Sequence, residues 1–161
     1  MDVTVDYRLT GTGWSSCRVE LYGQTCVVRA SYLSDALREL VSATNQMLEG
    51  AKECRFQFDE EPGEYRWILS STADGALRVR ILEFPQLWGE KPDSDGRTVL
   101  EATCPVKLFG EAVLVSLNRI LGDHGLRGYR ERWVEAEFPV ADYRVLCSKL
   151  GAPLSPAVFE V

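Results

Sequence analysis

The stretch from Glu53 to Phe84 constrains the fold most, because three consecutive segments within it alternate apolar and polar side chains. A period of two is typical of strands with one buried face, since successive side chains leave opposite sides of the pleat. The residues expected to be buried are Cys54, Phe56 and Phe58 in the first segment, Tyr65, Trp67 and Leu69 in the second, and Leu77, Val79 and Ile81 in the third. The pattern therefore predicts a meander of three antiparallel strands.

The parity of the buried positions predicts the loops between these strands. Buried positions are even-numbered in the first segment and odd-numbered in the second, so the loop between them needs an even number of residues. The residues from Glu61 to Glu64 fit this loop, and the resulting register places Asp59 opposite Arg66. Buried positions are odd in both later segments, so residues 73–75, which end in a glycine suited to a positive φ, fit the second loop.

The rest of the chain gives the element order βββ-α-ββββ-α-α. The other strands are expected within residues 3–30 and from Arg97 to Thr103, and the helices from Ser34 to Gly50, from Pro105 to Leu121 and from Pro139 to Gly151. Short turns between consecutive strands favour antiparallel pairing. We therefore expect an α+β, two-layer domain, with two or three helices packed on one face of a largely antiparallel, six- to seven-stranded sheet.

The length and the net charge of the chain limit the classes of protein to which it can belong. A chain of 161 residues is expected to form one globular domain over residues 1–161, with residues 152–161 as an extended or frayed tail. The net charge of −6 argues against nucleic acid and against an anionic membrane as partners, because such binding depends on neutralising negative charge. No signal peptide is visible, and no apolar run approaches the ~20 residues that span a bilayer. Since the five cysteines are scattered and form no CxxC pair, a cytoplasmic location is expected.

Metal and cofactor chemistry finds little support in the sequence. The chain has one histidine, His124, and no cysteine pair at ligand spacing, so we expect no zinc site. The residues from Asp93 to Gly96 hint at a calcium loop, but Arg97 and Thr98 break the EF-hand pattern. No GxGxxG, Walker or GxSxG motif is present. We therefore expect neither a metal nor a cofactor.

Asp123 and His124 are the candidates for catalysis. A histidine beside an aspartate can act as a general base, and Cys104 can serve as its nucleophile. Both residues, however, follow the second predicted helix, where a helix C-terminus favours a partly charged imidazole. An exposed helix cap is the simpler interpretation, so the sequence leans toward a protein that is not an enzyme.

The outer face of the predicted sheet is the better candidate for binding. Alternation places six arginines on it, namely Arg8, Arg18, Arg55, Arg66, Arg78 and Arg80. Arginine is enriched at interfaces and hot spots, although a solvent-exposed face of mixed charge has the same pattern. Trp88, in a Pro- and Gly-rich loop, and Trp133 lie in segments that alternation does not assign to the core, so each is a candidate contact for a partner. Trp14 and Trp67 are expected in the core.

The leading hypothesis is a small, non-catalytic protein-interaction module that binds a partner protein or a second copy of itself. Its candidate binding residues are Arg55, Arg66, Arg78, Arg80, Trp88 and Trp133. A small acidic α+β domain resembles many bacterial immunity and antitoxin-like proteins, an analogy of class that no motif carries. The alternative is a small-molecule-binding protein or enzyme with a pocket between sheet and helices near His124. Self-association through an exposed edge strand is a third hypothesis.

Overall fold

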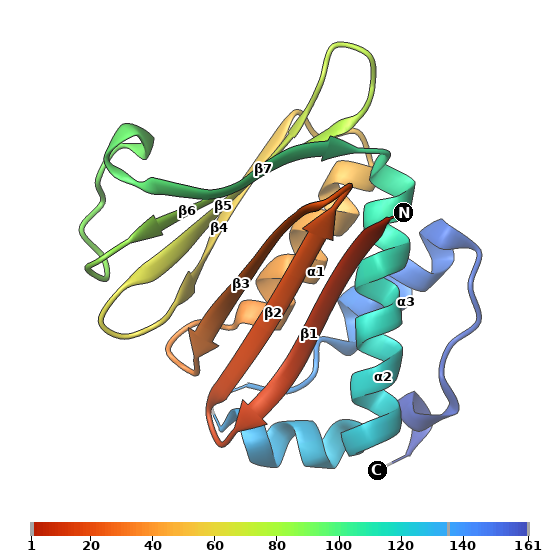
Figure 1. Ribbon diagram of the computed structural model, residues 1–161. Helices are drawn as coiled ribbons and strands as arrows, with labels where there is room; N and C mark the ends of the chain where they lie inside the picture. The colour runs from red at the N-terminus through yellow and green to blue at the C-terminus, as the bar shows by residue number, and fades with distance from the viewer. Residues whose placement is uncertain (1, 135, 161) are drawn as a thin grey trace.

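The seven strands of the computed structural model, which describes residues 2–134 and 136–160, form two antiparallel sheets (Figure 1). The first sheet has the order β1-β2-β3, with β1 (Val3–Gly11), β2 (Trp14–Leu21) and β3 (Gln24–Ser31). The second has the order β4-β5-β6-β7, with β4 (Glu53–Asp59), β5 (Glu64–Ser71), β6 (Leu77–Phe84) and β7 (Arg97–Cys104). The α+β class and the element order are as predicted, but the prediction of a single sheet is wrong.

The position of β3 accounts for the division into two sheets. This strand pairs with β2, whereas β4 and β7 pack against it without joining its ladder. Because β4 and β7 are the opposite edges of the second sheet, that sheet must twist and curve for both edges to reach β3. Alternation identifies the buried side of each strand, but it carries no information on which strands pair across a helical connection.

The meander forms as predicted, with one difference in register. All the apolar side chains that alternation assigned to its core are buried. The two loops span residues 60–63 and 72–76, so both parities are right, and Gly75 has a φ of 87°. Asp59, however, lies opposite Glu64 rather than Arg66. A loop of the same length that begins one residue earlier keeps the same buried face, so parity alone does not determine the register.

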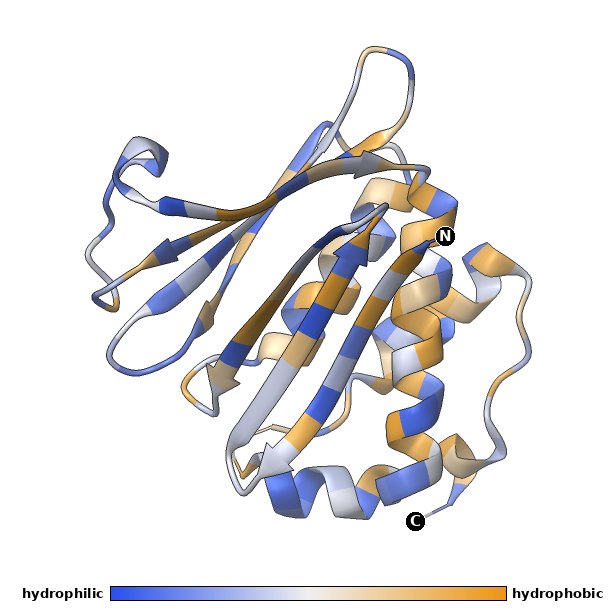
Figure 2. Ribbon diagram, viewed as in Figure 1, coloured by the Kyte–Doolittle hydropathy of each residue, from blue (hydrophilic) through white to orange (hydrophobic). Residues whose placement is uncertain are grey.

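The helices are α1 (Ala36–Leu48), α2 (Val106–Trp133) and α3 (Val140–Leu150). In Figure 1, α1 lies behind the first sheet, and α2 runs alongside β1. α1 is buried on several sides, because α2, α3 and β4 all contact it. Apolar side chains from both sheets and from these helices form one cluster, and Figure 2 shows the alternation that produces it along β1 and β2.

α2 departs most from its prediction. It was expected to end at Leu121, yet it continues to Trp133 with one break at Gly125, whose φ of 68° and ψ of 179° are not helical. Glycine adopts this positive φ without the clash that a Cβ atom would cause. After the break the helix turns beneath the ends of β1 and β2 (Figure 1), where the backbone N–H of Gly13 donates a hydrogen bond to the carbonyl of Arg132 at 2.6 Å.

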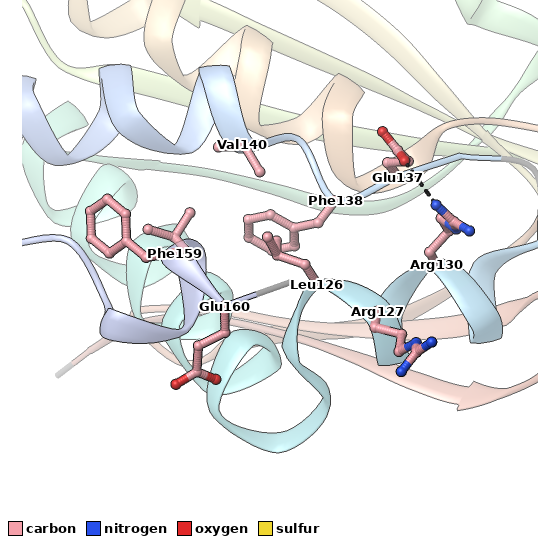
Figure 3. A pocket seen from close by; sticks show the side chains of 9 residues that line it. Leu126, Arg127, Arg130, Glu137, Phe138, Val140, Phe159 and Glu160 are labelled. Atoms are coloured by element: carbon pink, nitrogen blue, oxygen red, sulfur yellow. Dashed lines mark hydrogen bonds and ion pairs between the residues drawn. The ribbon is translucent and has the colours of Figure 1, made fainter.

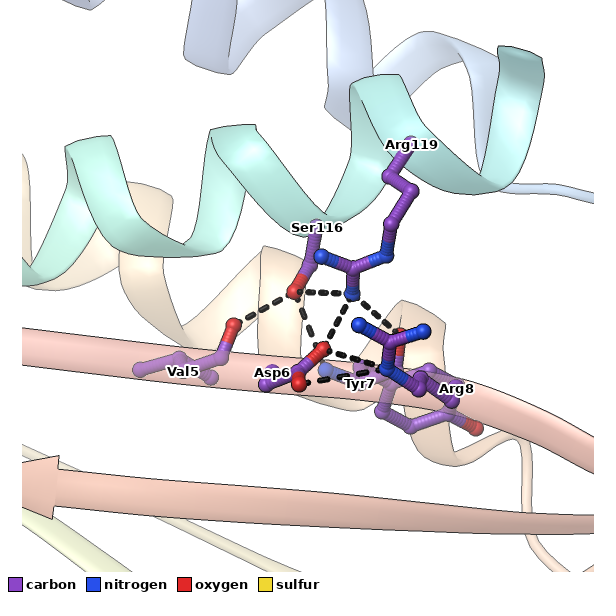
Figure 4. Close-up of polar contacts among 6 residues, drawn as sticks. All are labelled: Val5, Asp6, Tyr7, Arg8, Ser116 and Arg119. Atoms are coloured by element: carbon purple, nitrogen blue, oxygen red, sulfur yellow. Dashed lines mark hydrogen bonds and ion pairs between the residues drawn. The ribbon is translucent and has the colours of Figure 1, made fainter. Parts of the chain in front are cut away.

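α2 also covers part of the free edge of β1 (Figure 4). The Ser116 hydroxyl accepts a hydrogen bond from the backbone N–H of Tyr7 at 3.0 Å and donates one to the carbonyl of Val5. Arg119 donates to the carbonyl of Tyr7 at 3.1 Å and pairs with Asp6. Unpaired backbone groups at a sheet edge are a template for another chain. These contacts satisfy them, so this part of β1 does not support the hypothesis of self-association through an edge.

The C-terminal segment packs on the helices. Residues 152–155 have no regular structure, and the 3-10 helix η2 (Pro156–Phe159) packs on α2 with Val158 buried. The backbone N–H of Ser155 donates to the Tyr143 hydroxyl at 2.7 Å. The predicted tail is therefore held in place as far as it is described, and its last residue, Val161, lies outside the described residues.

Candidate functional site

The predicted arginine face is divided between the two sheets. Arg8 and Arg18 belong to the first sheet, and the four candidate binding arginines belong to the second. Each of those four pairs with a carboxylate of the same chain: Arg55 and Arg66 with Asp93, and Arg78 and Arg80 with Glu101. These four guanidinium groups share two carboxylates, and Glu53 also pairs with Arg55, so the second sheet presents a face of mixed charge.

The loop of residues 85–96 folds over the outer face of the second sheet. Asp93, in a 3-10 turn of this loop, accepts a hydrogen bond from Arg66 at 2.8 Å and pairs with Arg55. Hydrogen bonds from Arg55 and Arg66 lower the pKa of the Asp93 carboxyl to about 2. The Arg66 guanidinium lies 4.2 Å from the centroid of the Phe84 ring, which belongs to a second, smaller buried apolar cluster. The face predicted to be open is therefore partly covered.

Trp88 is held in an exposed position by this loop. Its side chain is 64% exposed, and its backbone N–H donates to Glu64 Oε1 at 2.8 Å. The indole N–H donates to Asp59 Oδ2 at 3.4 Å, and Asp59 and Glu64 are each only 3% exposed. A further hydrogen bond joins the backbone N–H of Leu87 to the carbonyl of Pro62 at 2.8 Å. The indole hydrogen bond orients the exposed ring, and the two backbone hydrogen bonds hold the loop that carries it.

The Trp88 region adjoins the turn between β3 and α1. The Ser34 hydroxyl accepts a hydrogen bond from the backbone N–H of Asp59 at 3.0 Å, and Arg29 of β3 pairs with Glu60 at 3.0 Å. The same turn carries an exposed aromatic and an exposed leucine side chain. Together with Trp88 and the nearby glutamates, they form what we call the turn surface, which comprises Tyr32, Leu33, Glu60, Glu61 and Trp88.

A cleft of about 390 Å³ opens beside the turn surface, lined by Tyr32, Leu33, Asp35, Trp133 and Ala136. Trp133 was predicted to be available to a partner, but it is fully buried there and stacks on Tyr129 with ring centroids 6.5 Å apart. The reason is the continuation of α2 beyond Gly125, which carries both rings under the first sheet. The assignment of Trp133 as an exposed binding residue is therefore wrong.

The alternation of β2 also corrects the placement of Trp14. Ser15 and Cys17 occupy the inward positions of this strand, so Trp14 lies on the outer side and is 37% exposed. Tyr32 and Leu33 were not among the predicted site residues. Their signal is an aromatic and a leucine in a four-residue turn (SYLS) that continues no alternating pattern.

The predicted catalytic candidates do not come together. Asp123 and His124 line a cleft of about 190 Å³ beside β1, smaller than the roughly 300 Å³ at which ligand pockets begin. Cys104 is buried at the opposite end of the first part of α2, about 30 Å away at the helical rise per residue. Burial also raises the pKa of the Cys104 thiol to about 11, which keeps it protonated. A Cys104–His124 catalytic pair is therefore excluded.

A larger cleft, of about 450 Å³, lies between the second part of α2, the start of α3 and the C-terminal segment (Figure 3). Its lining combines apolar side chains with two arginines and two glutamates: Leu126, Phe138, Val140, Val158 and Phe159, and Arg127, Arg130, Glu137 and Glu160. Arg130 and Glu137 pair at 3.4 Å. The cleft can offer apolar contact and ion pairing, but its lining contains no serine, cysteine or histidine.

The comparisons with known proteins point to no function, so a function is argued from the surfaces described above. No protein-family model, curated protein or solved structure matches this chain. In the part of the chain that the structure describes, no group of three or more His, Cys, Asp or Glu side chains could hold a metal ion. No described helix is both long and apolar enough to cross a membrane.

Proposed function

We propose that this protein is a non-catalytic interaction module that binds a partner protein through the turn surface. The observation that carries the proposal is Trp88, whose ring is exposed while its indole N–H donates to Asp59 and its backbone N–H donates to Glu64. Tryptophan and tyrosine dominate interface hot spots. A side chain that is already immobilised loses less entropy on binding, so a fixed tryptophan contributes more affinity than a mobile one.

The chemistry of the turn surface favours a partner with basic residues. Glu61 is exposed, whereas Glu60 is already paired with Arg29, and the chain carries a net charge of −6. Opposite charges on two partners speed their encounter and suppress wrong partners. The arginines of the second sheet add no support, because each already has a carboxylate partner within the chain.

A module of this kind has the general character of bacterial immunity and antitoxin-like proteins, and that likeness remains one of class. Its five cysteines are all free. Free thiols persist where the surroundings are reducing, so a cytoplasmic location belongs to the proposal.

Affinity capture from a lysate of the native host tests the proposal. The tagged protein should retain one protein in stoichiometric amount, and Trp88→Ala combined with Tyr32→Ala should reduce it at least about tenfold. Arg78→Gln with Arg80→Gln is the matched control, because it alters an exposed, ion-paired part of the molecule away from the turn surface. A partner retained equally by both variants, or no partner at all, would contradict the proposal.

Small-molecule binding is a second candidate, favoured by the volume and apolar lining of the cleft in Figure 3. A ligand that binds the folded state raises the melting temperature, and above its dissociation constant the rise grows with the logarithm of the ligand concentration. In this case a metabolite panel should contain a compound that raises the melting temperature of the protein and of His124→Ala, but not of Phe159→Ala. The absence of any rise across the panel would count against this candidate, and a rise lost only in His124→Ala would favour the smaller cleft instead.

A further inference from the structure

The cleft in Figure 3 has an apolar interior to which three segments of the chain contribute. Phe138 and Val158 line it and belong to the main core cluster, where both are almost fully buried. Phe159, the next residue along the chain, is 63% exposed. Arg144, which does not line the cleft, lies 5.5 Å from the centroid of its ring. The cleft therefore combines a floor that belongs to the core with a side of exposed apolar surface.

Formal charges of both signs lie at the edges of this cleft. Arg127 pairs with Glu131 at 3.8 Å, Arg130 pairs with Glu137 at 3.4 Å, and all four side chains are at least 68% exposed. Such exposed ion pairs contribute little, so either guanidinium group can exchange its partner for the carboxylate of a ligand. Glu160 lies across the apolar side chains from Arg127 (Figure 3), is exposed, and forms no ion pair with the described residues.

This combination of charges limits the class of ligand. A ligand with only a negative charge would meet Glu137 and Glu160 as well as the arginines, and a ligand with only a positive charge would meet the arginines as well as the glutamates. A wholly apolar ligand would displace water from charged groups without replacing it. A zwitterion with apolar groups can pair with both signs and cover the apolar surface.

A dipeptide with free ends is the smallest peptide of this kind. Its ammonium and carboxylate groups lie further apart than those of a free amino acid, because each added residue lengthens the chain by up to about 3.6 Å. This separation suits charges on opposite sides of an apolar cleft. The volume of about 450 Å³ lies within the range of small-molecule sites.

We propose that the cleft binds a dipeptide with apolar side chains and free ends, whose carboxylate pairs with Arg127 and whose ammonium group pairs with Glu160. The apolar side chains of the dipeptide contact Phe138 and Phe159. Arg127 is assigned to the carboxylate because its present ion pair is the longer of the two. This inference rests on the second candidate function, small-molecule binding by the same cleft, and is independent of the turn surface.

Isothermal titration calorimetry of the full chain with leucyl-phenylalanine tests the inference. Binding should be saturable, with a dissociation constant below about 1 mM for a ligand of this size. N-acetyl-leucyl-phenylalanine lacks the ammonium group and leucyl-phenylalanine amide lacks the carboxylate, so each should bind about threefold more weakly. Glycylglycine keeps both charges without the apolar side chains and should show no measurable binding.

Charge-reversal variants assign the two ends of the dipeptide. Glu160→Lys should weaken binding of leucyl-phenylalanine severalfold without weakening that of the N-acetyl derivative, which has no ammonium group. Arg127→Glu should weaken binding of leucyl-phenylalanine without weakening that of its amide, which has no carboxylate. Arg132→Glu is the matched control, because Arg132 is exposed in the same part of α2 and does not line the cleft. It should bind leucyl-phenylalanine as the parent protein does.

Three outcomes would overturn the inference: no saturable binding of leucyl-phenylalanine at millimolar concentration, equally tight binding of either derivative, or charge reversals that weaken the dipeptide and its derivatives alike. The inference and the function on which it rests fail separately. If another compound raises the melting temperature of the parent protein and not of Phe159→Ala, while leucyl-phenylalanine does not bind, small-molecule binding by the cleft stands and the dipeptide is the wrong class of ligand.

Discussion

Two buried tyrosines, Tyr143 and Tyr129, differ in what their hydroxyl groups do. The Tyr143 hydroxyl donates to Asn118 Oδ1 at 2.7 Å and accepts from the backbone N–H of Ser155 at 2.7 Å. It therefore joins α3 to α2 and to the C-terminal segment. The Tyr129 hydroxyl makes no hydrogen bond with the described residues. Burying a polar group costs free energy unless a hydrogen bond compensates, so the first hydroxyl should stabilise the fold and the second should not.

Two buried serines repeat the contrast. The Ser116 hydroxyl bonds to two backbone groups at the edge of β1, whereas the Ser15 hydroxyl makes no hydrogen bond with any described residue. In each pair, the first group stabilises a junction between elements through two hydrogen bonds.

Replacing each of the two serines by alanine should give the largest difference in the free energy of unfolding. Ser116→Ala leaves the N–H of Tyr7 and the carbonyl of Val5 without their partner, so it should lower the free energy of unfolding by about 2 kcal/mol. Ser15→Ala removes a hydroxyl that bonds to no described residue and should stay within about 0.5 kcal/mol of the parent protein. Urea unfolding measures both values. Equal losses would remove the distinction between the two serines.

The two tyrosine variants should differ less from each other in their free energy of unfolding than the two serine variants do. Tyr143→Phe should lower the free energy of unfolding by about 1 kcal/mol, because two hydrogen bonds are lost at a partly exposed junction. Tyr129→Phe should leave it unchanged or raise it slightly, since the variant no longer buries an unpaired hydroxyl. Thermal and urea unfolding of both variants check this. A loss in Tyr129→Phe as large as in Tyr143→Phe would show that the Tyr129 hydroxyl already serves the fold.

The ion pairs of the second sheet should contribute least to the free energy of unfolding, and their contribution should depend on pH. The pKa of Asp93 is about 2 in the folded protein, below its ordinary value of 3.8, so its stabilisation is present above that ordinary value and is lost as the pH falls through about 2. Asp93→Asn should therefore cost at most about 1 kcal/mol near neutral pH, because solvent screens this partly exposed pair. The difference in the free energy of unfolding between Asp93→Asn and the parent protein should become smaller as the pH is lowered toward 2.

Asp95→Asn is the control in the same loop, because Asp95 forms no ion pair with the described residues. It should leave the free energy of unfolding unchanged at either pH. A deficit in Asp93→Asn that persists undiminished toward pH 2 would show that the carboxylate charge is not its cause.

Local patterns predicted the parts of the fold that depend on local geometry. The buried faces of the meander follow from the two-residue period of a strand, and the loop parities follow from those faces. The division into two sheets depends on which strands meet across α1, which no local pattern encodes. The course of α2 was missed because the glycines near residue 125 indicate a helix end, whereas the chain resumes helical geometry after one residue.

The candidate site was predictable only in part. Trp88 could be selected from its Pro- and Gly-rich loop, but the carboxylates that bond to it, Asp59 and Glu64, were assigned only to a hairpin and its loop. Trp133 was selected for the wrong reason, since it lies beneath the cleft and not on the surface. The buried polar atoms without a hydrogen-bond partner had no signal in the sequence, because the lack of such a partner is a property of the complete packing.

Hydrogen–deuterium exchange of the free protein and of its complex with the captured partner tests the central claim most directly. The partner should slow exchange in the turn of residues 31–35, the hairpin loop of residues 60–63 and the segment around Trp88. The loop of residues 72–76, at the other end of the second sheet, should exchange at its free rate. Slower exchange along β7 beside the arginine ion pairs, with none around Trp88 or residues 31–35, would contradict the assignment of the turn surface as the binding site.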